Sequence, residues 1–245
     1  MVDRSMTRWL LIALAALGAA AAPAAAETPL KAVVELFTSQ GCSSCPPADA
    51  RLAELARRPD VVALTLPVDY WDYLGWKDTL ARPEFSARQR AYSHGRGDRA
   101  VFTPQMVVNG ALACIGSDGG AVDRTLDQAA GEGSALPVQV RARLEGGSVR
   151  IEIEGSEATP SGVWLLPVLR SRDVAIGRGE NRGRAVTYVN VVRGVLRVGE
   201  WSGGSMKLDA ALPPGEEADA YVVLVQAMRG TKPARILGAA KVGAF

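Results

Sequence analysis

Two cysteines separated by two residues are the strongest candidates for chemistry in this chain. Cys42 and Cys45 directly follow an apolar run that begins at Val33. Where a strand runs into a helix, the first sulfur lies near backbone N–H groups and the positive end of a helix dipole, which lowers a thiol pKa from about 8.5 toward 3.5–7.5. We therefore predict an exposed pair that performs thiol–disulfide exchange, with Cys42 as the nucleophile and Cys45 resolving the mixed disulfide.

A disulfide that only fastens the turn is the alternative for this pair. A bridge between Cys42 and Cys45 closes a very short loop, so it adds little chain-entropy stabilisation, which favours the redox interpretation. Pro46 and Pro47 follow the second cysteine. Proline is tolerated in the first turn of a helix, so we expect the helix to begin near Pro46, which leaves Cys42 farther from the helix end and less acidic.

Glu35 is an acidic residue in the middle of the apolar run. If it is buried, the loss of solvation raises its pKa toward the range in which a carboxylate accepts a proton from a thiol. The alternative is that Glu35 points to the surface or pairs with Lys31. Periodicity does not assign faces on a buried strand, so both interpretations stay open.

The segment after the next apolar run is rich in aromatic residues, namely Tyr70, Trp71, Tyr73 and Trp76. Such clusters commonly pack beneath a loop, but an alternative is that Tyr70 and Trp71 line a peptide groove near Cys42. His94 is the only histidine. A single histidine and one cysteine pair make a poor zinc set, because zinc takes four ligands, so no metal site is predicted and His94 is expected in an exposed loop.

The elements around these residues follow from periodicity and turn signals. A strand over 33–38, a helix ending at Pro59 and a strand over 61–68 form a βαβ unit with parallel strands. Pro83 begins a second helix, which ends near Gly95, and Asp118 caps a last helix. Asn109-Gly110 predicts a hairpin between 101–108 and 111–115.

A two-residue turn at Asn109-Gly110 places Gln105 opposite Cys114, one strand farther across the sheet than Pro104. Cys114 is then too far from Cys42 for a native disulfide, because bridged Cα atoms lie within about 7 Å. We predict that Cys114 is a free, buried thiol in protein whose Cys42–Cys45 pair is oxidised.

The pattern changes after Gly131. From Val138 onward the chain has short strand-like runs separated by Gly and Pro, which is typical of a β-sandwich of about 100 residues. These runs are 138–144, 149–153, 163–169, 186–192, 206–208 and 220–227.

The N-terminus has the pattern of a cleaved signal peptide over residues 1–26. Arg4 and Arg8 precede an Ala-rich apolar run that ends at Ala26 and is too short for a strong membrane anchor. Cleavage removes two positive charges and Asp3, so the net charge falls from +2 to +1. Charges of both signs are interspersed, so no nucleic-acid partner is expected. We predict a periplasmic or secreted protein without stable membrane insertion.

Several strings carry a resemblance to a known family, namely 35–49, 68–72, Thr103-Pro104-Gln105, 179–181 and 188–193. They resemble an exported bacterial thioredoxin-like family known as domain of unknown function 1223. The resemblance implies an α/β thioredoxin-like domain over residues 31–130, followed by a smaller all-β sandwich-like domain over residues 137–245. It also implies that Pro104 is cis and faces the cysteines, that Thr103 contacts a bound peptide, and that Glu35 stands behind Cys45.

The leading hypothesis is an exported thiol–disulfide oxidoreductase that acts on cysteines of another cell-envelope protein, with no cofactor beyond its own cysteines. The alternatives are a redox-inert binding module with a structural disulfide and, less favoured, a metallochaperone, which would need reduced cysteines and a third ligand. The dipeptide Ser43-Ser44 does not decide between oxidation, reduction and isomerisation.

Overall fold

The computed structural model describes residues 28–131 and 135–245, so the expected signal peptide lies outside the described residues. Within that part of the chain, no helix is long and apolar enough to cross a membrane. Up to residue 131 the elements are β1 (Ala32–Thr38), α1 (Pro46–Ala56), β2 (Val61–Pro67), the 3₁₀ turn η1 (Asp72–Leu74), α2 (Pro83–Arg96), β3 (Gln105–Val108), β4 (Leu112–Ile115) and α3 (Gly119–Ala130).

The helices begin where local sequence dictates. Proline occupies the first turn of α1 and of α2, where its missing N–H has no intrahelical partner to lose. The side chain of Asp118 accepts a hydrogen bond from the backbone N–H of Ala121 at 2.9 Å and so caps α3. The parallel pairing of β1 with β2 confirms the predicted βαβ unit.

The remaining strands are β5 (Gln139–Glu145), β6 (Ser148–Gly155), β7 (Ser161–Ala175), β8 (Ala185–Val192), β9 (Leu196–Trp201), β10 (Gly204–Ala211), β11 (Ala220–Arg229) and β12 (Lys232–Gly243). Strands β9 and β12 were not predicted from the sequence. The central part of β12, Ile236-Leu237-Gly238-Ala239-Ala240, is poor in the β-branched residues that identify strands.

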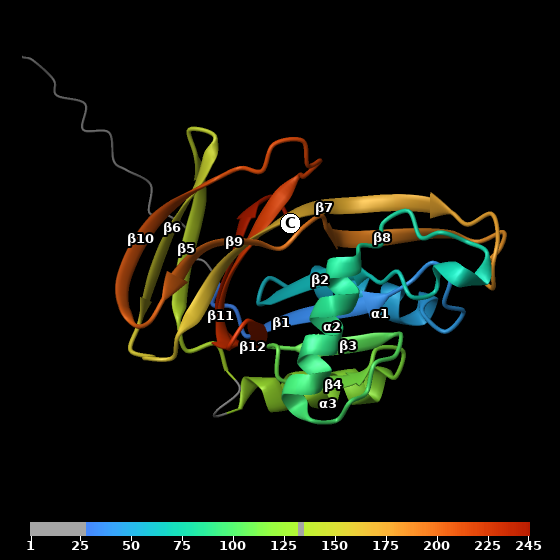
Figure 1. Ribbon diagram of the computed structural model, residues 1–245, viewed down its shortest axis with the longest axis horizontal. Coiled ribbons are helices and arrows are strands. Elements are labelled where there is room, and N and C mark those ends of the chain that lie inside the picture. Colours follow the sequence, from blue (N-terminus) through green and yellow to red (C-terminus); the bar gives the residue numbers. More distant parts are fainter. Residues whose placement is uncertain (1–27, 132–134) are drawn as a thin grey trace, which may run out of the picture.

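The expected fold class, a thioredoxin-like α/β domain followed by a separate β domain, is wrong. The protein is mostly β, and one mixed sheet of nine strands includes strands from both halves of the chain. Its order is β12-β11-β7-β8-β2-β1-β3-β4, with β9 also paired to β7 (Figure 1). One edge of β2 pairs with β1 and the other is covered by β8. For this reason β2 is buried along its whole length.

The junction between β2 and β8 depends on side chains as well as on the backbone. The strands run parallel and are paired at Thr65 and Val191. The Thr65 hydroxyl donates to the carbonyl of Val189 at 2.6 Å, and the amide of Asn190 donates to the carbonyl of Ala63 at 2.9 Å. These polar side chains satisfy backbone groups that a short ladder leaves unpaired.

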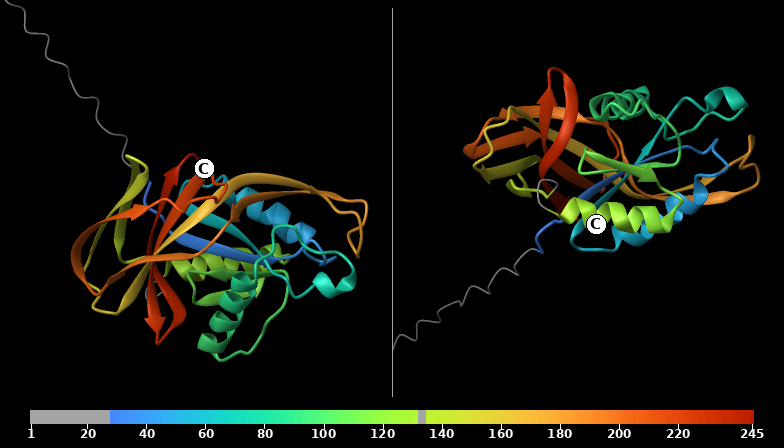
Figure 2. Two further views of the ribbon diagram at one scale, coloured as in Figure 1. Left: turned by 45° about the horizontal axis from the view of Figure 1, so that its top comes forward. Right: turned by 90° about the horizontal axis from the view of Figure 1, so that it is seen from below.

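Three helices cover the two faces of the large sheet. In the right-hand view of Figure 2, α2 lies on one side of the sheet and α1 and α3 lie on the other. The side chains of β1 alternate between the two cores: Val33 and Phe37 pack with Phe85 and Tyr92 of α2, whereas Val34 and Leu36 pack on the side of α1 and α3. A smaller sheet, β10-β6-β5, packs against the β7, β11 and β12 end of the large sheet through a separate apolar core.

Candidate functional site

The candidate site is a disulfide between Cys42 and Cys45, with 5.4 Å between their Cα atoms. Cys45 is the N-cap residue of α1, and the helix begins at Pro46 as expected. The predicted exposure is wrong, because the exposed fraction is 1% for Cys42 and 0% for Cys45. Only Ser43 and Ser44, between the cysteines, are exposed. A reaction at this disulfide therefore requires a local opening of the structure.

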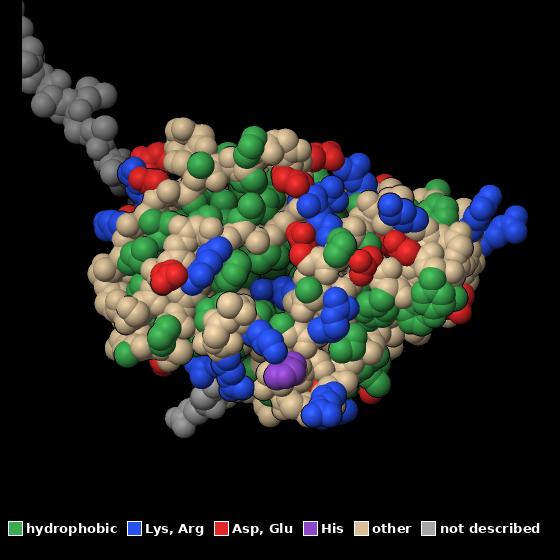
Figure 3. Space-filling view, viewed as in Figure 1, with side chains coloured by type: hydrophobic (Ala, Val, Ile, Leu, Met, Phe, Trp, Pro, Cys, Tyr) green, Lys and Arg blue, Asp and Glu red, His purple; other side chains and the backbone are tan. Residues whose placement is uncertain are grey.

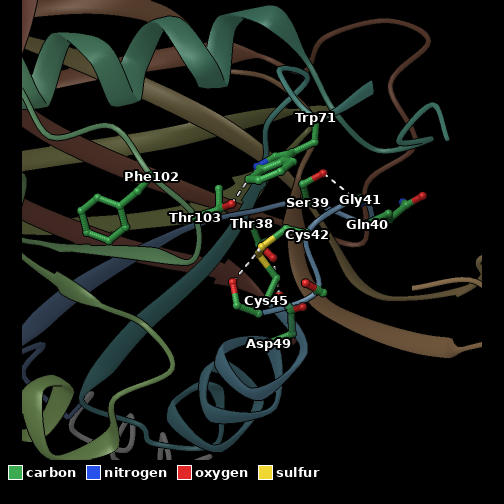
Figure 4. The surroundings of a disulfide bond; sticks show 12 residues. Thr38, Ser39, Gln40, Gly41, Cys42, Cys45, Asp49, Trp71, Phe102 and Thr103 are labelled. Carbon is green, nitrogen blue, oxygen red and sulfur yellow. Dashed lines mark hydrogen bonds between the residues drawn. A yellow bond between two sulfur atoms is a disulfide. The ribbon is translucent and has the colours of Figure 1, made fainter. Parts of the chain in front are cut away.

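Asp49 is a buried carboxylic acid one helical turn after Cys45, and Figure 4 shows it beside the disulfide. Its Oδ1 accepts a hydrogen bond from the Thr38 hydroxyl at 2.8 Å, and its Oδ2 is buried with no hydrogen-bond partner among the described residues. Burial raises the pKa of Asp49 to about 7, and the nearby Asp78 contributes, although the bond from Thr38 opposes the shift. A carboxyl with this pKa can exchange a proton near neutral pH.

The loop that leads into Cys42 is held by Asp78. One carboxylate oxygen of Asp78 accepts from the backbone N–H of Gln40 at 2.8 Å, and the other accepts from the N–H groups of Leu80 and Ala81. Burial raises the pKa of Asp78 to about 6 against these hydrogen bonds. The Gln40 side chain accepts a hydrogen bond from the indole of Trp76 at 2.8 Å. These contacts fix the backbone just before the first cysteine.

The opposite side of the disulfide is formed by Trp71 and Thr103 (Figure 4). The indole N–H of Trp71 donates to the Thr103 hydroxyl at 2.8 Å, and the Thr103-Pro104 peptide bond is cis, as expected. Because Gln105 pairs with Phe37, Pro104 lies beside the end of β1, from which the cysteine loop continues. Three of the expected site residues, Trp71, Thr103 and Pro104, therefore lie on this side of the cysteine loop.

The turn between β7 and β8 reaches the cysteine loop from the second half of the chain. The amide of Asn181 donates to the carbonyls of Gln40 and Cys42, at 3.0 Å and 2.8 Å. The carboxylate of Glu180 accepts from the backbone N–H of Ser43 at 3.2 Å. Hydrogen bonds from Ser43 lower the pKa of Glu180. Both residues lie in a string that supported the family resemblance, but no role was predicted for them.

Glu35 is buried but does not stand behind Cys45. It lies on the α2 side of the sheet, opposite to α1, where its Oε1 accepts from Nε of Arg88 at 2.6 Å and its Oε2 accepts from the Tyr92 hydroxyl at 2.6 Å. Arg88 and Tyr92 also contact Gln226 of β11. Neither Lys31 nor solvent is its partner: Lys31 pairs with Asp60 instead. The structure gives Glu35 a buried ion pair.

The other aromatic residues and the histidine are more dispersed. Tyr70 packs beside Trp71, with 6.3 Å between ring centroids, and its hydroxyl donates to Gln89 of α2, while Tyr73 is exposed. His94 is exposed as expected but lies in α2, not in a loop. Across residues 28–131 and 135–245, no three His, Cys, Asp or Glu side chains form a group that could hold a metal ion.

Cys114 is a free thiol, but its predicted register and complete burial are wrong. Met106, not Gln105, is its partner across the hairpin, and the thiol is only partly buried. The loop between β3 and β4 has three residues because Asn109 bonds other strands and does not pair within the hairpin. Its backbone N–H and its side chain both bond Val33, and its carbonyl accepts from the N–H of Ile236. Cys114 is only partly buried because β4 is an edge strand, so the core covers the residue on one side only. Burial raises the pKa of this thiol.

No role was predicted from the sequence for four residues of the site, namely Asp49, Asp78, Glu180 and Asn181. A signal existed for Asp49, which lies four residues after Cys45 and three before Leu52, on the inward face of a helix that begins at the second cysteine. For Asp78 and Asn181 no local pattern indicates their contacts with the cysteine loop, because that loop lies 38 or more positions away in the sequence.

Comparisons with known proteins agree on the family. Residues 33–226 match the family model described as "Protein of unknown function (DUF1223)". A crystal structure of a protein from Agrobacterium tumefaciens, solved in a structural genomics programme, is 35% identical with a TM-score of 0.77, over 89% of this chain and 96% of that one. A weaker match is the human F-spondin reeler domain, with 12% identity and a TM-score of 0.19 over 44% of this chain and 93% of that one. No curated protein matches the chain.

Proposed function

Because the chain belongs to the DUF1223 family, whose description states no activity, we propose from the geometry of the site that it is a thiol–disulfide oxidoreductase acting on cysteines of another protein. The observation that carries the proposal is the position of Asp49, a buried acid whose pKa burial raises to about 7, beside the Cys42–Cys45 disulfide. A disulfide that only fastens a turn has no use for an adjacent group that binds and releases protons.

The reaction needs no group beyond the two cysteines and a proton carrier. A thiolate of the partner attacks Sγ of Cys42, the bond between the two sulfurs breaks, and Cys45 leaves as a thiolate, which takes a proton from protonated Asp49. A second thiolate of the partner then attacks its own sulfur in the mixed disulfide and releases Cys42. In the reverse direction, the Cys42 thiolate attacks a partner disulfide, and the Asp49 carboxylate takes the proton from Cys45 as Cys45 attacks Cys42.

Differences between the surroundings of the two cysteines support these roles. Cys45 caps α1, so the positive end of the helix dipole stabilises its thiolate as it leaves. Cys42 is next to the exposed Ser43 and lies on the side of Trp71 and Thr103. We extend the proposal to these neighbours: Thr103, Pro104, Trp71 and Tyr70 would contact the polypeptide that carries the reacting cysteine.

One observation favours a second function, a redox-inert binding module. Cys42 is 1% exposed, so the disulfide is not open to attack without movement of the chain around it. The two functions predict different redox equilibria. A redox-active pair has a reduction potential between about −270 and −120 mV, whereas a structural bridge lies below about −300 mV.

We expect a potential in the redox-active range, measured by equilibrating the protein with glutathione or dithiothreitol mixtures and counting alkylated thiols by mass spectrometry. The control is Cys114→Ser, which removes the third thiol and should leave the potential unchanged, since Cys114 is not part of the bridge. A value below about −300 mV would support the binding module and reject the oxidoreductase.

Replacing Asp49 by asparagine should slow exchange at pH 7–8 by about 10- to 100-fold, because Cys45 loses its proton carrier while Thr38 keeps an acceptor for its hydroxyl. The rate profile should also lose the ionisation near pH 7. The matched control is Asp127→Asn, which removes an exposed carboxylate from α3. An unchanged rate and pH profile in Asp49→Asn would exclude Asp49 from the reaction.

The same variant has an expected effect on stability whose sign follows from the raised pKa. The folded protein binds the Asp49 proton up to about pH 7, whereas the unfolded chain releases it near 3.8, so the free energy of unfolding falls as the pH rises between these values. The loss is on the order of 4 kcal/mol and persists above pH 7. Asp49→Asn should remove this slope, which denaturant titrations at pH 4 and pH 8 measure.

A further inference from the structure

Four cations without ion-pair partners surround the turn that contacts the cysteine loop. Arg178, Arg182 and Arg184 lie on the turn between β7 and β8, and Lys77 lies next to Trp76, against which the turn packs. All four are exposed, and no salt bridge or side-chain hydrogen bond joins any of them to another described residue. We call these four residues the basic patch. Figure 3 shows Lys and Arg side chains projecting from this end of the molecule.

The turn holds these charges at a fixed place next to the disulfide. Its backbone is closed by hydrogen bonds between Ile176 and both Gly183 and Arg184, with donor–acceptor distances of 2.8 and 2.9 Å. Asn181, which is 1% exposed, bonds the carbonyl of Cys42. Because Asn181 lies between the arginines along the chain, the turn that carries them is hydrogen-bonded directly to the cysteine loop.

The charge of the patch is not balanced within the protein. Elsewhere exposed arginines commonly pair with carboxylates, as Arg58 does with Asp60 and Arg150 does with Asp209. On the turn the single acid is Glu180, and its carboxylate accepts from the backbone of Ser43. The other acids near the site are Asp49 and Asp78, which are buried, and Asp69 and Asp72, which are partly buried. Like charges held together without a counter-charge repel one another, and binding a polyanionic surface relieves this repulsion.

We propose that the basic patch docks an acidic segment of the partner protein, one in which Asp and Glu residues flank the reacting cysteine. Guanidinium groups bind carboxylates through paired charge-assisted hydrogen bonds. Docking there brings the flanked cysteine next to Cys42. The inference rests on the proposed function and names the class of its substrate.

The test uses the full-length reduced protein and three ten-residue peptides, each with one cysteine in a mixed disulfide with thionitrobenzoate. The residues around the cysteine are Asp and Glu, Ser, or Lys. The Cys42 thiolate attacks the peptide sulfur, and the coloured thionitrobenzoate thiolate leaves. Each rate is divided by the rate with dithiothreitol, which is neutral, so that the intrinsic reactivity of each peptide cancels.

We expect the acidic peptide to react about tenfold faster than the serine peptide at 50 mM salt and about twofold faster at 500 mM, because salt screens charges at the surface. The variant Lys77→Gln/Arg178→Gln/Arg182→Gln/Arg184→Gln should react equally with both. Its matched control, Arg57→Gln/Arg141→Gln/Arg170→Gln/Lys232→Gln, removes the same charge from other exposed positions and should keep the preference. Equal rates in the wild type, or a preference that survives in the patch variant, would overturn the inference.

A binding measurement separates this inference from the proposed function. If no peptide releases thionitrobenzoate, the oxidoreductase fails, and fluorescence anisotropy of the acidic peptide with serine in place of cysteine then decides the inference. Binding to the oxidised wild type and the control, with at least tenfold weaker binding to the patch variant, would support the basic patch as an acidic docking surface. Absence of binding to the wild type would reject it.

Discussion

Cys42→Ser is expected to abolish thiol–disulfide exchange, lowering the rate more than a thousandfold, whereas Cys45→Ser should form a mixed disulfide with the partner and stop there. In the proposed reaction the first sulfur attacks, and the second releases the partner by attacking the first. Incubating each variant with a reducible protein and separating the products on a non-reducing gel, followed by mass spectrometry, distinguishes the two outcomes.

Neither substitution should unfold the protein, because the bridge spans a sequence separation of only 3 and gives little chain-entropy stabilisation. Circular dichroism of both variants checks this point. Cys114→Ser is the matched control, since it removes a thiol of similar size that is not bridged, and it should keep full activity. Equal residual activity in Cys42→Ser and Cys45→Ser would contradict the assigned roles.

Arg88→Met is expected to lower the free energy of unfolding by about 3–5 kcal/mol, because it leaves the carboxylate of Glu35 buried without a counter-charge. The side chain of Glu35 is 0% exposed and that of Arg88 is 6% exposed, so water does not replace the lost partner. Tyr92 and Gln226 also lose a hydrogen bond. Urea denaturation of the variant and the wild type measures the difference.

The control is Arg90→Met on the same helix, which alters an exposed arginine and should change stability by no more than about 0.5 kcal/mol. A second variant separates the uncompensated charge from lost packing. Adding Glu35→Gln to Arg88→Met should recover part of the loss, because the remaining buried group is then neutral. A deficit that does not recover in the double variant would refute this explanation.

Local sequence determined the elements around the cysteines. Two apolar runs are separated by the cysteine loop, a helical pattern and Pro59-Asp60. This order predicts two parallel strands joined by a helix, and the structure contains this unit. The first residue of α1 and the cap of α3 also depend on neighbours close in sequence. The cis bond at Thr103-Pro104 was predicted from the family resemblance, since a short X-Pro string alone does not specify its isomer.

Tertiary structure decided how these elements are joined and which side chains meet. The pairing of β2 with β8 links residues more than a hundred positions apart, and no local pattern states which strand will cover a buried edge. The side chains of β1 alternate between the two faces of the sheet, which places Glu35 on one of them. That face is covered by α2, whereas Cys45 lies at the start of α1 on the other face, and only the packing of the helices decides this. In the same way, Asn109 contacts other strands and shifts the hairpin by one residue. The burial of Cys42 and its link to Asn181 depend on a turn from the other half of the chain, because a side chain's environment is set by long-range packing.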